Sequence, residues 1–348
     1  MTNLNVPGLD LPAYMREVGE RARAASRLLA RAPTAAKNTA LEAIALAIIR
    51  DEKSLLSANA QDVAASRGAG SDAAFVDRLA LDASSVAAMA EGVREIVIVS
   101  QDTMAYGKDI GLANGITTLL SRLVRIDGLK WVRFLYCYPN MVSAELVRLV
   151  AEQERLCKYF DIPYQHASRS ALERMKRGGH RVIYERQIEA IRKLMPDAGL
   201  RTSFIVGFPG ETEDDFNEVL GFIKSVQFDN VGVFLYSDEE GTDAFDLNGK
   251  IPRRVATRRR NQLMKQQAMI SKNKLREMVG RKVEVLLEGR SDESDLLLQG
   301  RMETQAPEID GHVLINDAGE VEPASGGFYN VEITGSLEYD LIGRIVRD

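Results

Sequence analysis

From Glu95 to about Arg254 the chain alternates short apolar segments with amphipathic ones, and this rhythm constrains the fold more than any other feature. The apolar segments have the length of strands, and the segments between them, such as Ser143–Arg155 and Thr212–Val226, have the apolar spacing of helices. The predicted strands are Ile96–Val99, Trp131–Leu135, Tyr159–Ile162, Thr202–Val206 and Val231–Leu235. Repeated strand–helix units predict an α/β fold with a parallel sheet, curled into a full or partial TIM-like barrel.

Polar residues follow the carboxyl end of each predicted strand. Working residues of parallel barrels lie at that edge, so these segments are the candidate site. They are Ser100-Gln101-Asp102-Thr103, Tyr136-Cys137-Tyr138-Pro139, Gln165-His166-Ala167-Ser168, Gly207-Phe208-Pro209-Gly210-Glu211, and Tyr236-Ser237 with Glu239-Glu240-Gly241-Thr242.

The two flanking stretches differ from this pattern. Residues 1–94 are Ala-rich with helical apolar spacing, and Pro33 and Gly68 mark expected helix boundaries. Residues 280–348 form short strands separated by glycines, which predicts a small closed β-barrel of the OB-like kind. The expected strands are Lys282–Leu287, Leu296–Met302, His312–Ile315, Tyr329–Thr334 and Ile342–Val346. Three parts are therefore expected: residues 1–94, 95–279 (ending in a basic helix near Pro252–Val279) and 280–348.

Charge is distributed unevenly, although the net charge is only −5. Residues 252–282 contain 11 Lys or Arg and one acid, Glu277, whereas residues 283–348 contain 4 Lys or Arg and 15 Asp or Glu. An acidic barrel should avoid RNA phosphate and favour a basic protein partner, or its acids form only a solubilising face. The basic run Arg253-Arg254 and Arg258-Arg259-Arg260 is interpreted as a solvated helix face, with contact to RNA or to the acidic barrel as alternatives.

The chain has no predicted signal peptide and no apolar run of membrane-spanning length, which predicts a cytoplasmic protein without membrane contact. Its two cysteines, Cys137 and Cys157, are too far apart for a cluster-binding run and are interpreted as plain buried thiols. No catalytic residue or metal ligand is assigned.

Several loops, taken in order, resemble the radical S-adenosylmethionine (SAM) methylthiotransferases. They are Val99-Ser-Gln-Asp-Thr-Met-Ala-Tyr-Gly107, Leu135-Tyr-Cys-Tyr-Pro139, Asp161-Ile-Pro-Tyr-Gln-His-Ala-Ser168, Phe204-Ile-Val-Gly-Phe-Pro-Gly-Glu-Thr212 and Phe234-Leu-Tyr-Ser-Asp-Glu-Glu-Gly-Thr242. Ala306-Pro-Glu-Ile-Asp-Gly311 resembles the TRAM domain that ends those enzymes. The resemblance covers about 250 residues and implies SAM and [4Fe-4S] cofactors. It also implies a substrate aspartate on small-subunit ribosomal protein twelve, a basic protein that the acidic TRAM domain would bind.

The resemblance also implies roles for individual residues. Ser100, Gln101 and Asp102 would lie where the methionyl amino group is bound. Gln165, His166 and Ser168 would face the cofactor or substrate. A backbone wall against the adenosine would be formed by Gly207, Phe208, Pro209, Gly210 and Glu211.

In that family a Cys-x3-Cys-x2-Cys loop before the segment starting at Glu95 holds the cluster, and a separate domain holds a second one. Neither is found here, which predicts a chain without turnover. Instead, Met15–Arg27, Asn59–Asp62 and Phe75–Leu79 resemble the start of the γ-glutamyl phosphate reductases, NADPH-dependent enzymes of the aldehyde dehydrogenase superfamily. The sequence therefore reads as a chimera. Three hypotheses follow: an inactive methylthiotransferase relative, a non-catalytic binding module, and a reductase fragment of proline biosynthesis.

Overall fold

The computed structural model describes residues 34–70 and 92–347 with gaps at 127, 292–293, 320 and 322, together with 19, 21, 76, 79–81 and 86. The chain divides into two compact units, Met1–Gly92 and Val93–Asp348. In the first unit α2 (Thr34–Arg50) begins directly after Pro33, and α3 (Glu52–Gly68) ends at the predicted glycine. Asn59 of α3 donates to the Leu79 carbonyl and accepts from the Leu81 amide, both at 2.8 Å.

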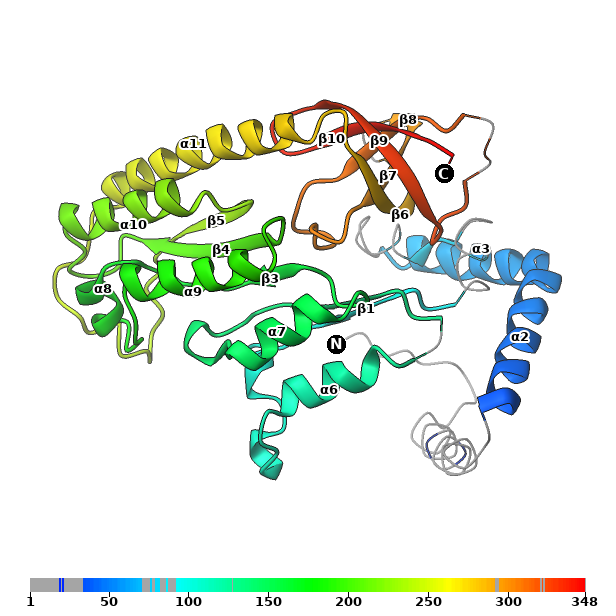
Figure 1. Cartoon of the computed structure of the whole chain (residues 1–348), viewed down its shortest axis with the longest axis horizontal. Helices are drawn as coiled ribbons and strands as arrows, with labels where there is room; N and C mark the ends of the chain where they lie inside the picture. Colours follow the sequence, from blue (N-terminus) through cyan, green and yellow to red (C-terminus); the bar gives the residue numbers. More distant parts are fainter. Residues whose placement is uncertain are drawn as a thin grey trace. The chain divides into compact units, whose positions relative to one another are not determined.

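The second unit contains the five predicted parallel strands (Figure 1). They are β1 (Glu95–Ile98), β2 (Trp131–Phe134), β3 (Tyr159–Asp161), β4 (Gly199–Val206) and β5 (Asn230–Leu235). All pairings are parallel, in a β1–β2 sheet and a β3–β4–β5 sheet. The two sheets meet at an isolated bridge between Val132 and Leu156 and through the Cys137 amide, which donates to the Asp161 carbonyl at 2.8 Å. The described strands thus form a partial barrel.

Helices connect successive strands, as the apolar periodicity predicted. They are α6 (Gly115–Leu123), α7 (Ala144–Glu152), α8 (Arg169–Arg174), α9 (Arg181–Leu194) and α10 (Glu213–Val226), with 3-10 turns at η1 (Thr103–Ala105), η2 (Lys108–Ile110) and η3 (Pro139–Met141). The start of α10 is fixed by a capping box, in which Thr212 and Asp215 each accept from the other's backbone amide. None of the helices in the described part combines the length and apolarity needed to cross a bilayer.

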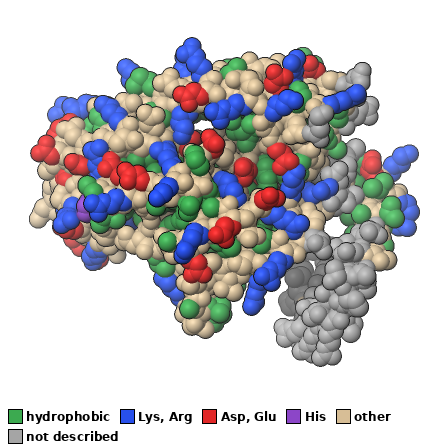
Figure 2. All heavy atoms as spheres, viewed as in Figure 1, with side chains coloured by type: hydrophobic (Ala, Val, Ile, Leu, Met, Phe, Trp, Pro, Cys, Tyr) green, Lys and Arg blue, Asp and Glu red, His purple; other side chains and the backbone are tan. Residues whose placement is uncertain are grey.

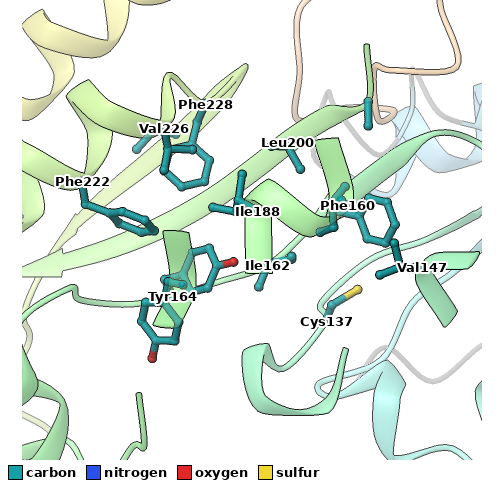
Figure 3. Close-up of a cluster of buried hydrophobic side chains, with 14 of the residues drawn as sticks. Cys137, Val147, Phe160, Ile162, Tyr164, Ile188, Leu200, Phe222, Val226 and Phe228 are labelled. Carbon is teal, nitrogen blue, oxygen red and sulfur yellow. The ribbon is translucent and has the colours of Figure 1, made fainter. Parts of the chain in front are cut away.

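The core of this domain lies between the sheets and their helices (Figure 3). Its aromatic centre is Tyr164, whose ring packs 4.3 Å from Tyr184 and 5.3 Å from Phe222 (centroid distances). Phe222 in turn meets Phe228 edge to face at 5.3 Å. These rings are almost fully buried, so they anchor α9 and α10 to the sheet.

The chain continues through the 25-residue helix α11 (Arg253–Glu277), which packs against α10 and β5 and leads to the small barrel (Figure 1). The barrel strands are β6 (Lys282–Ser291), β7 (Ser294–Arg301), β8 (Val313–Asp317), β9 (Phe328–Ser336) and β10 (Leu341–Ile345). They close in the order β10-β8-β7-β6-β9, which confirms the predicted small β-barrel. Alternate residues such as Val285, Val331 and Ile333 point into its core.

The small barrel is held against the amino-terminal ends of β1 and β2. Glu95 binds Arg133 at 3.0 Å and Arg301 of β7 at 2.7 Å, and all three side chains are at least nine-tenths buried. Beside this network, Trp131 meets Phe328 of β9 edge to face at 4.8 Å between centroids. These contacts lie at the amino-terminal ends of the parallel strands.

Candidate cofactor site

A cavity of about 350 Å³ lies at the carboxyl-terminal ends of the parallel strands, and we call it the strand-end cavity. Every parallel strand, or the residues just after it, contributes to its lining. The lining residues are Gln101, Tyr136, Tyr138, Asp161, Pro163, Gln165, Arg177, Arg201, Ser203, Ile205 and Phe234. Its size and its few convergent polar groups are those of a small-molecule site.

Strand β4 shows how the sequence builds this wall. Thr202, Phe204 and Val206 are buried, while the alternate residues Arg201, Ser203 and Ile205 are half-buried and line the cavity. Because side chains alternate across a strand, one face of β4 packs against helices and the other faces the site.

Two residues at the strand ends have left-handed backbone conformations. Tyr136, after β2, has φ 57°, and Gln165, after β3, has φ 67°. Both conformations are held by hydrogen bonds: the Tyr136 amide donates to the Asp161 carboxylate at 3.1 Å, and the Gln165 amide donates to the Ser203 carbonyl at 2.8 Å. Such strain in a non-glycine residue is retained where the surroundings over-determine it, as they do at many binding sites.

The predicted residues after β1 separate into two places. Gln101 lines the strand-end cavity. Ser100 and Asp102 line a second hollow of about 420 Å³ formed with Tyr106 and Asp109. Asp102 also caps η1, because its carboxylate accepts from the Met104 amide at 3.1 Å.

His166 and Ser168 lie in a buried polar cluster rather than among the cavity-lining residues. His166 Nδ1 accepts from the Ser168 amide at 3.0 Å, and Ser168 and Ser170 both donate to Asp215. Arg174 donates to the same carboxylate at 3.2 Å. Burial lowers the pKa of His166 to about 4, so the ring is neutral at pH 7. The His166 Nε2 atom is buried without a hydrogen-bond partner.

The Asp215 carboxylate is held in its charged form by this cluster. Burial opposes ionisation, but hydrogen bonds from Ser168, Ser170 and Thr212 outweigh it and place the pKa of Asp215 well below its ordinary value. The cluster ties the start of α8 to the start of α10 and so fixes the loop that carries Gln165.

The loop Gly207–Glu211 is folded around a buried ion pair. Glu211 accepts from the Gly207 and Phe208 amides and binds Arg259 of α11 at 2.8 Å. Gly207 has φ 81°, and a Cβ there would lie 2.5 Å from Ala256 Cβ, so glycine is needed for the approach of α11. Phe208 and Pro209 are buried and Gly210 is half-buried in this loop, and none of the five lines the strand-end cavity.

Arg259 also corrects one interpretation of the basic run. Its side chain is only 5% exposed and pairs with Glu211 and Glu213, so it is part of the interior rather than of a solvated helix face. Arg253, Arg254 and Arg258 are exposed, as expected.

Both cysteines are buried thiols. Burial raises the pKa of Cys137 well above its ordinary value and that of Cys157 to about 12. Cys137 packs in the main core near Val147 and Phe160 (Figure 3). Both thiols are enclosed by protein, and two cysteines are fewer than the three ligands that a [4Fe-4S] cluster of this family needs. Within the described residues, no group of three His, Cys, Asp or Glu side chains is arranged to hold a metal ion.

Four polar cavity residues were given no role by the sequence: Asp161, Arg177, Arg201 and Ser203. Asp161 stood only as the first residue of one family-like loop, and Arg201 and Ser203 lie on β4. Tyr136 and Tyr138 stood in the candidate loops, although the resemblance gave them no role. The sequence of β4 gave no period-two signal, because Arg201, Thr202 and Ser203 are three consecutive polar residues; only their burial in the structure alternates.

Comparisons with known proteins agree with this architecture. Residues 77–223 match the model of the radical SAM superfamily, and residues 279–346 match that of the TRAM domain. The second unit is thus a radical SAM domain followed by a TRAM domain.

Within that class the chain is homologous to the ribosomal protein uS12 methylthiotransferases RimO. It is 50% identical over 259 residues to the protein from Koribacter versatilis, covering 74% of this chain and 51% of the relative. It is 47% identical to the protein from Solibacter usitatus, covering 74% of this chain and 56% of the relative. It is 44% identical to the protein from Sorangium cellulosum, covering 74% of this chain and 54% of the relative. The chain therefore spans little more than half the length of these relatives.

Proposed function

We propose that this chain binds SAM, or a nucleoside close to it, in the strand-end cavity, and that it does not cleave it reductively. The observation that carries the proposal is the convergence of all five parallel strands on one small polar cavity in a radical SAM domain. Gln101 and Asp161 offer acceptors for the methionyl ammonium, and Arg177 and Arg201 offer donors for its carboxylate. Tyr136 and Phe234 supply aromatic surface for the adenine.

The remaining predicted site residues do not line the strand-end cavity but are proposed to support it. They are Ser100, Asp102, His166, Ser168 and Gly207–Glu211. Ser100 and Asp102 border the neighbouring hollow, from which they can meet the polar end of a bound ligand. The other residues hold the β3–α8 and β4–α10 loops in place through protein contacts. When bound, SAM would supply a sulfonium group to this site.

The residues of this chain do not fit a [4Fe-4S] cluster. Three closely placed thiolates are needed to hold one, and the chain contains two cysteines, both buried, one after β2 and one just before β3. No step of a reaction is therefore assigned to the cluster. The proposal places this chain within the methylthiotransferase family as a binding protein without turnover.

Calorimetric titration of the full chain with SAM tests the binding half of the proposal. Phe234→Ala should weaken binding about tenfold, because aromatic stacking on a base contributes ~1–3 kcal/mol. Phe245→Ala is the matched control, since Phe245 is also exposed and does not line the cavity. Absent binding, or equal loss in both variants, would contradict it. Anaerobic incubation with iron and sulfide tests the other half: a stable visible absorption of [4Fe-4S] would show that ligands exist.

A second proposal concerns the small barrel as a docking module for basic ribosomal protein uS12, the protein named in the RimO relatives. Residues 283–348 hold 15 acidic and 4 basic side chains, and Arg301 and Arg344 among the latter are paired with glutamates. Acidic and basic side chains are interspersed on the face shown in Figure 2, so the net excess rather than a single patch supports the idea. Full-length chain should bind the purified ribosomal protein more tightly than ribosomal RNA at low and moderate salt. Equal or tighter RNA binding would contradict it.

The third proposal is that residues 1–94 come from a γ-glutamyl phosphate reductase, which makes the chain a chimera. The helices α2 and α3 lie in this stretch, and the radical SAM match begins inside it, at residue 77. An NADPH-linked assay with glutamate semialdehyde should show no activity. Genomic sequence across residues 77–95 decides the origin: a continuous frame with an upstream cysteine-bearing segment would contradict the proposal.

A further inference from the structure

One loop of the small barrel reaches a wall of the strand-end cavity. Within Ala306–Gly311, the Asp310 side chain is fully buried. Its Oδ2 accepts from the Tyr159 hydroxyl at 2.6 Å and from the Ala306 amide at 2.9 Å, and its Oδ1 binds Arg201 at 3.2 Å. Arg201 also donates to the Ile309 carbonyl at 3.3 Å. The loop is thus fastened to β3 and β4 by a carboxylate that water does not reach.

Arg201 connects this loop to the cavity. Its guanidinium lies between two carboxylates, with Nη1 on Asp310 and Nε 3.5 Å from Asp161 Oδ1. Arg201 and Asp161 both line the strand-end cavity. Each carboxylate therefore limits where the guanidinium can lie, because Arg presents its donors in one rigid plane.

Asp161 connects Arg201 to the backbone of Tyr136 at the cavity. Its other oxygen, Oδ2, accepts from the Tyr136 amide, the residue held at φ 57°. A chain of contacts therefore runs from Asp310 through Arg201 and Asp161 to the strained backbone of Tyr136.

We propose that Asp310 is a positioning residue for the strand-end cavity, setting the conformation of Tyr136 through Arg201 and Asp161. The expected effect on ligand affinity rests on the proposed function. The structural linkage from Asp310 to Tyr136 does not. Coupling between two sites is reciprocal. A partner that displaces the 306–311 loop would therefore lower the affinity for the nucleoside, and bound nucleoside would stabilise the loop.

The test compares Asp310→Asn with Glu308→Gln in the full chain. Both remove one negative charge from the same loop, but Glu308 is exposed. The first measurement, on ligand-free protein, is hydrogen exchange of the Tyr136 amide by NMR. Asp310→Asn should accelerate exchange about fivefold or more, whereas Glu308→Gln should leave it unchanged. Arg201→Lys should have the same effect as Asp310→Asn, and the double variant should add little, as expected within one linkage.

The second measurement is affinity for S-adenosylhomocysteine, which Asp310→Asn should lower about fivefold or more. The only tryptophan, Trp131, reports the domain interface through its contact with Phe328, and its emission should not change. Unchanged Tyr136 exchange, an equal effect of Glu308→Gln, or a shift in Trp131 emission would overturn the proposal. If the unmodified chain fails to bind the probe, the proposed function fails, while the exchange comparison still decides the linkage.

Discussion

The two ends of the parallel strands are built on different principles. At the amino-terminal end, Glu95 is shared by Arg133 and Arg301, and the surrounding rings exclude water. At the carboxyl-terminal end, the cavity is lined by the strained residues Tyr136 and Gln165, with aromatic surface exposed. The first end is organised for cohesion and the second for binding, a division expected of a parallel barrel.

The largest effect is expected at the cohesive end. Arg133→Ala should lower the free energy of unfolding by about 3–5 kcal/mol in urea titrations, because it leaves a buried partner charge incompletely paired. Lys130 lies close to Arg133 in the chain and forms a surface ion pair with Glu284; Lys130→Ala should cost less than about 1 kcal/mol. Equal losses of unfolding free energy in the two variants would contradict the view that the amino-terminal end is held by buried charge pairing.

His166 makes the binding end sensitive to acid. Its pKa is about 4 in the folded chain and 6.5 unfolded, so the unfolded state binds the proton more readily. The stabilising contribution is complete above pH 6.5 and is lost as pH falls toward 4, by up to about 3 kcal/mol. Unfolding free energies at several pH values should show this slope, and His166→Gln should flatten it. An unchanged slope in the variant would assign the acid sensitivity elsewhere.

Two glycines with left-handed backbone conformations distinguish the cost of a steric contact from the cost of backbone strain. Gly207→Ala should destabilise by about 2–3 kcal/mol, because the new Cβ meets both an unfavourable φ and Ala256. Gly111→Ala has a similar φ of 70° and no neighbour within 4 Å, so about 1 kcal/mol is expected. The denaturant midpoints of the two variants measure this difference. Equal midpoints would show that Gly207 is not needed for the close packing of α11.

The smallest effect on stability is expected at the strained rim. Tyr136→Gly relieves a left-handed conformation while adding flexibility to the unfolded chain, so the change should lie between zero and about 1 kcal/mol of stabilisation. Nucleoside affinity should fall at the same time. A clear loss of stability in thermal melts would show that Tyr136 belongs to the cohesive part of the domain.

The strands and the order of the domains could be predicted because their pattern is local. The parallel strands include short apolar runs such as Phe204–Val206 of β4, and glycines separate the strands of the small barrel. The radical SAM and TRAM assignments rested on loops whose order is itself sequence information.

Charged residues that pair over long distances could not be predicted in the same way. Arg259 stands in a basic run that looks solvated, yet its partner Glu211 is 48 residues away. Arg201 meets Asp310 across 109 residues and two domains. Sequence spacing carries no signal for such contacts, because the fold alone brings the partners together.

We propose that the strand-end cavity binds SAM although the chain holds no iron–sulfur cluster that could reduce it. The most direct measurement incubates anaerobic full-length protein, pretreated with iron and sulfide, with SAM and dithionite, and quantifies 5′-deoxyadenosine and methionine. We expect no dithionite-dependent product from protein that binds SAM in the calorimetric titration. Formation of 5′-deoxyadenosine in proportion to dithionite and protein would contradict it.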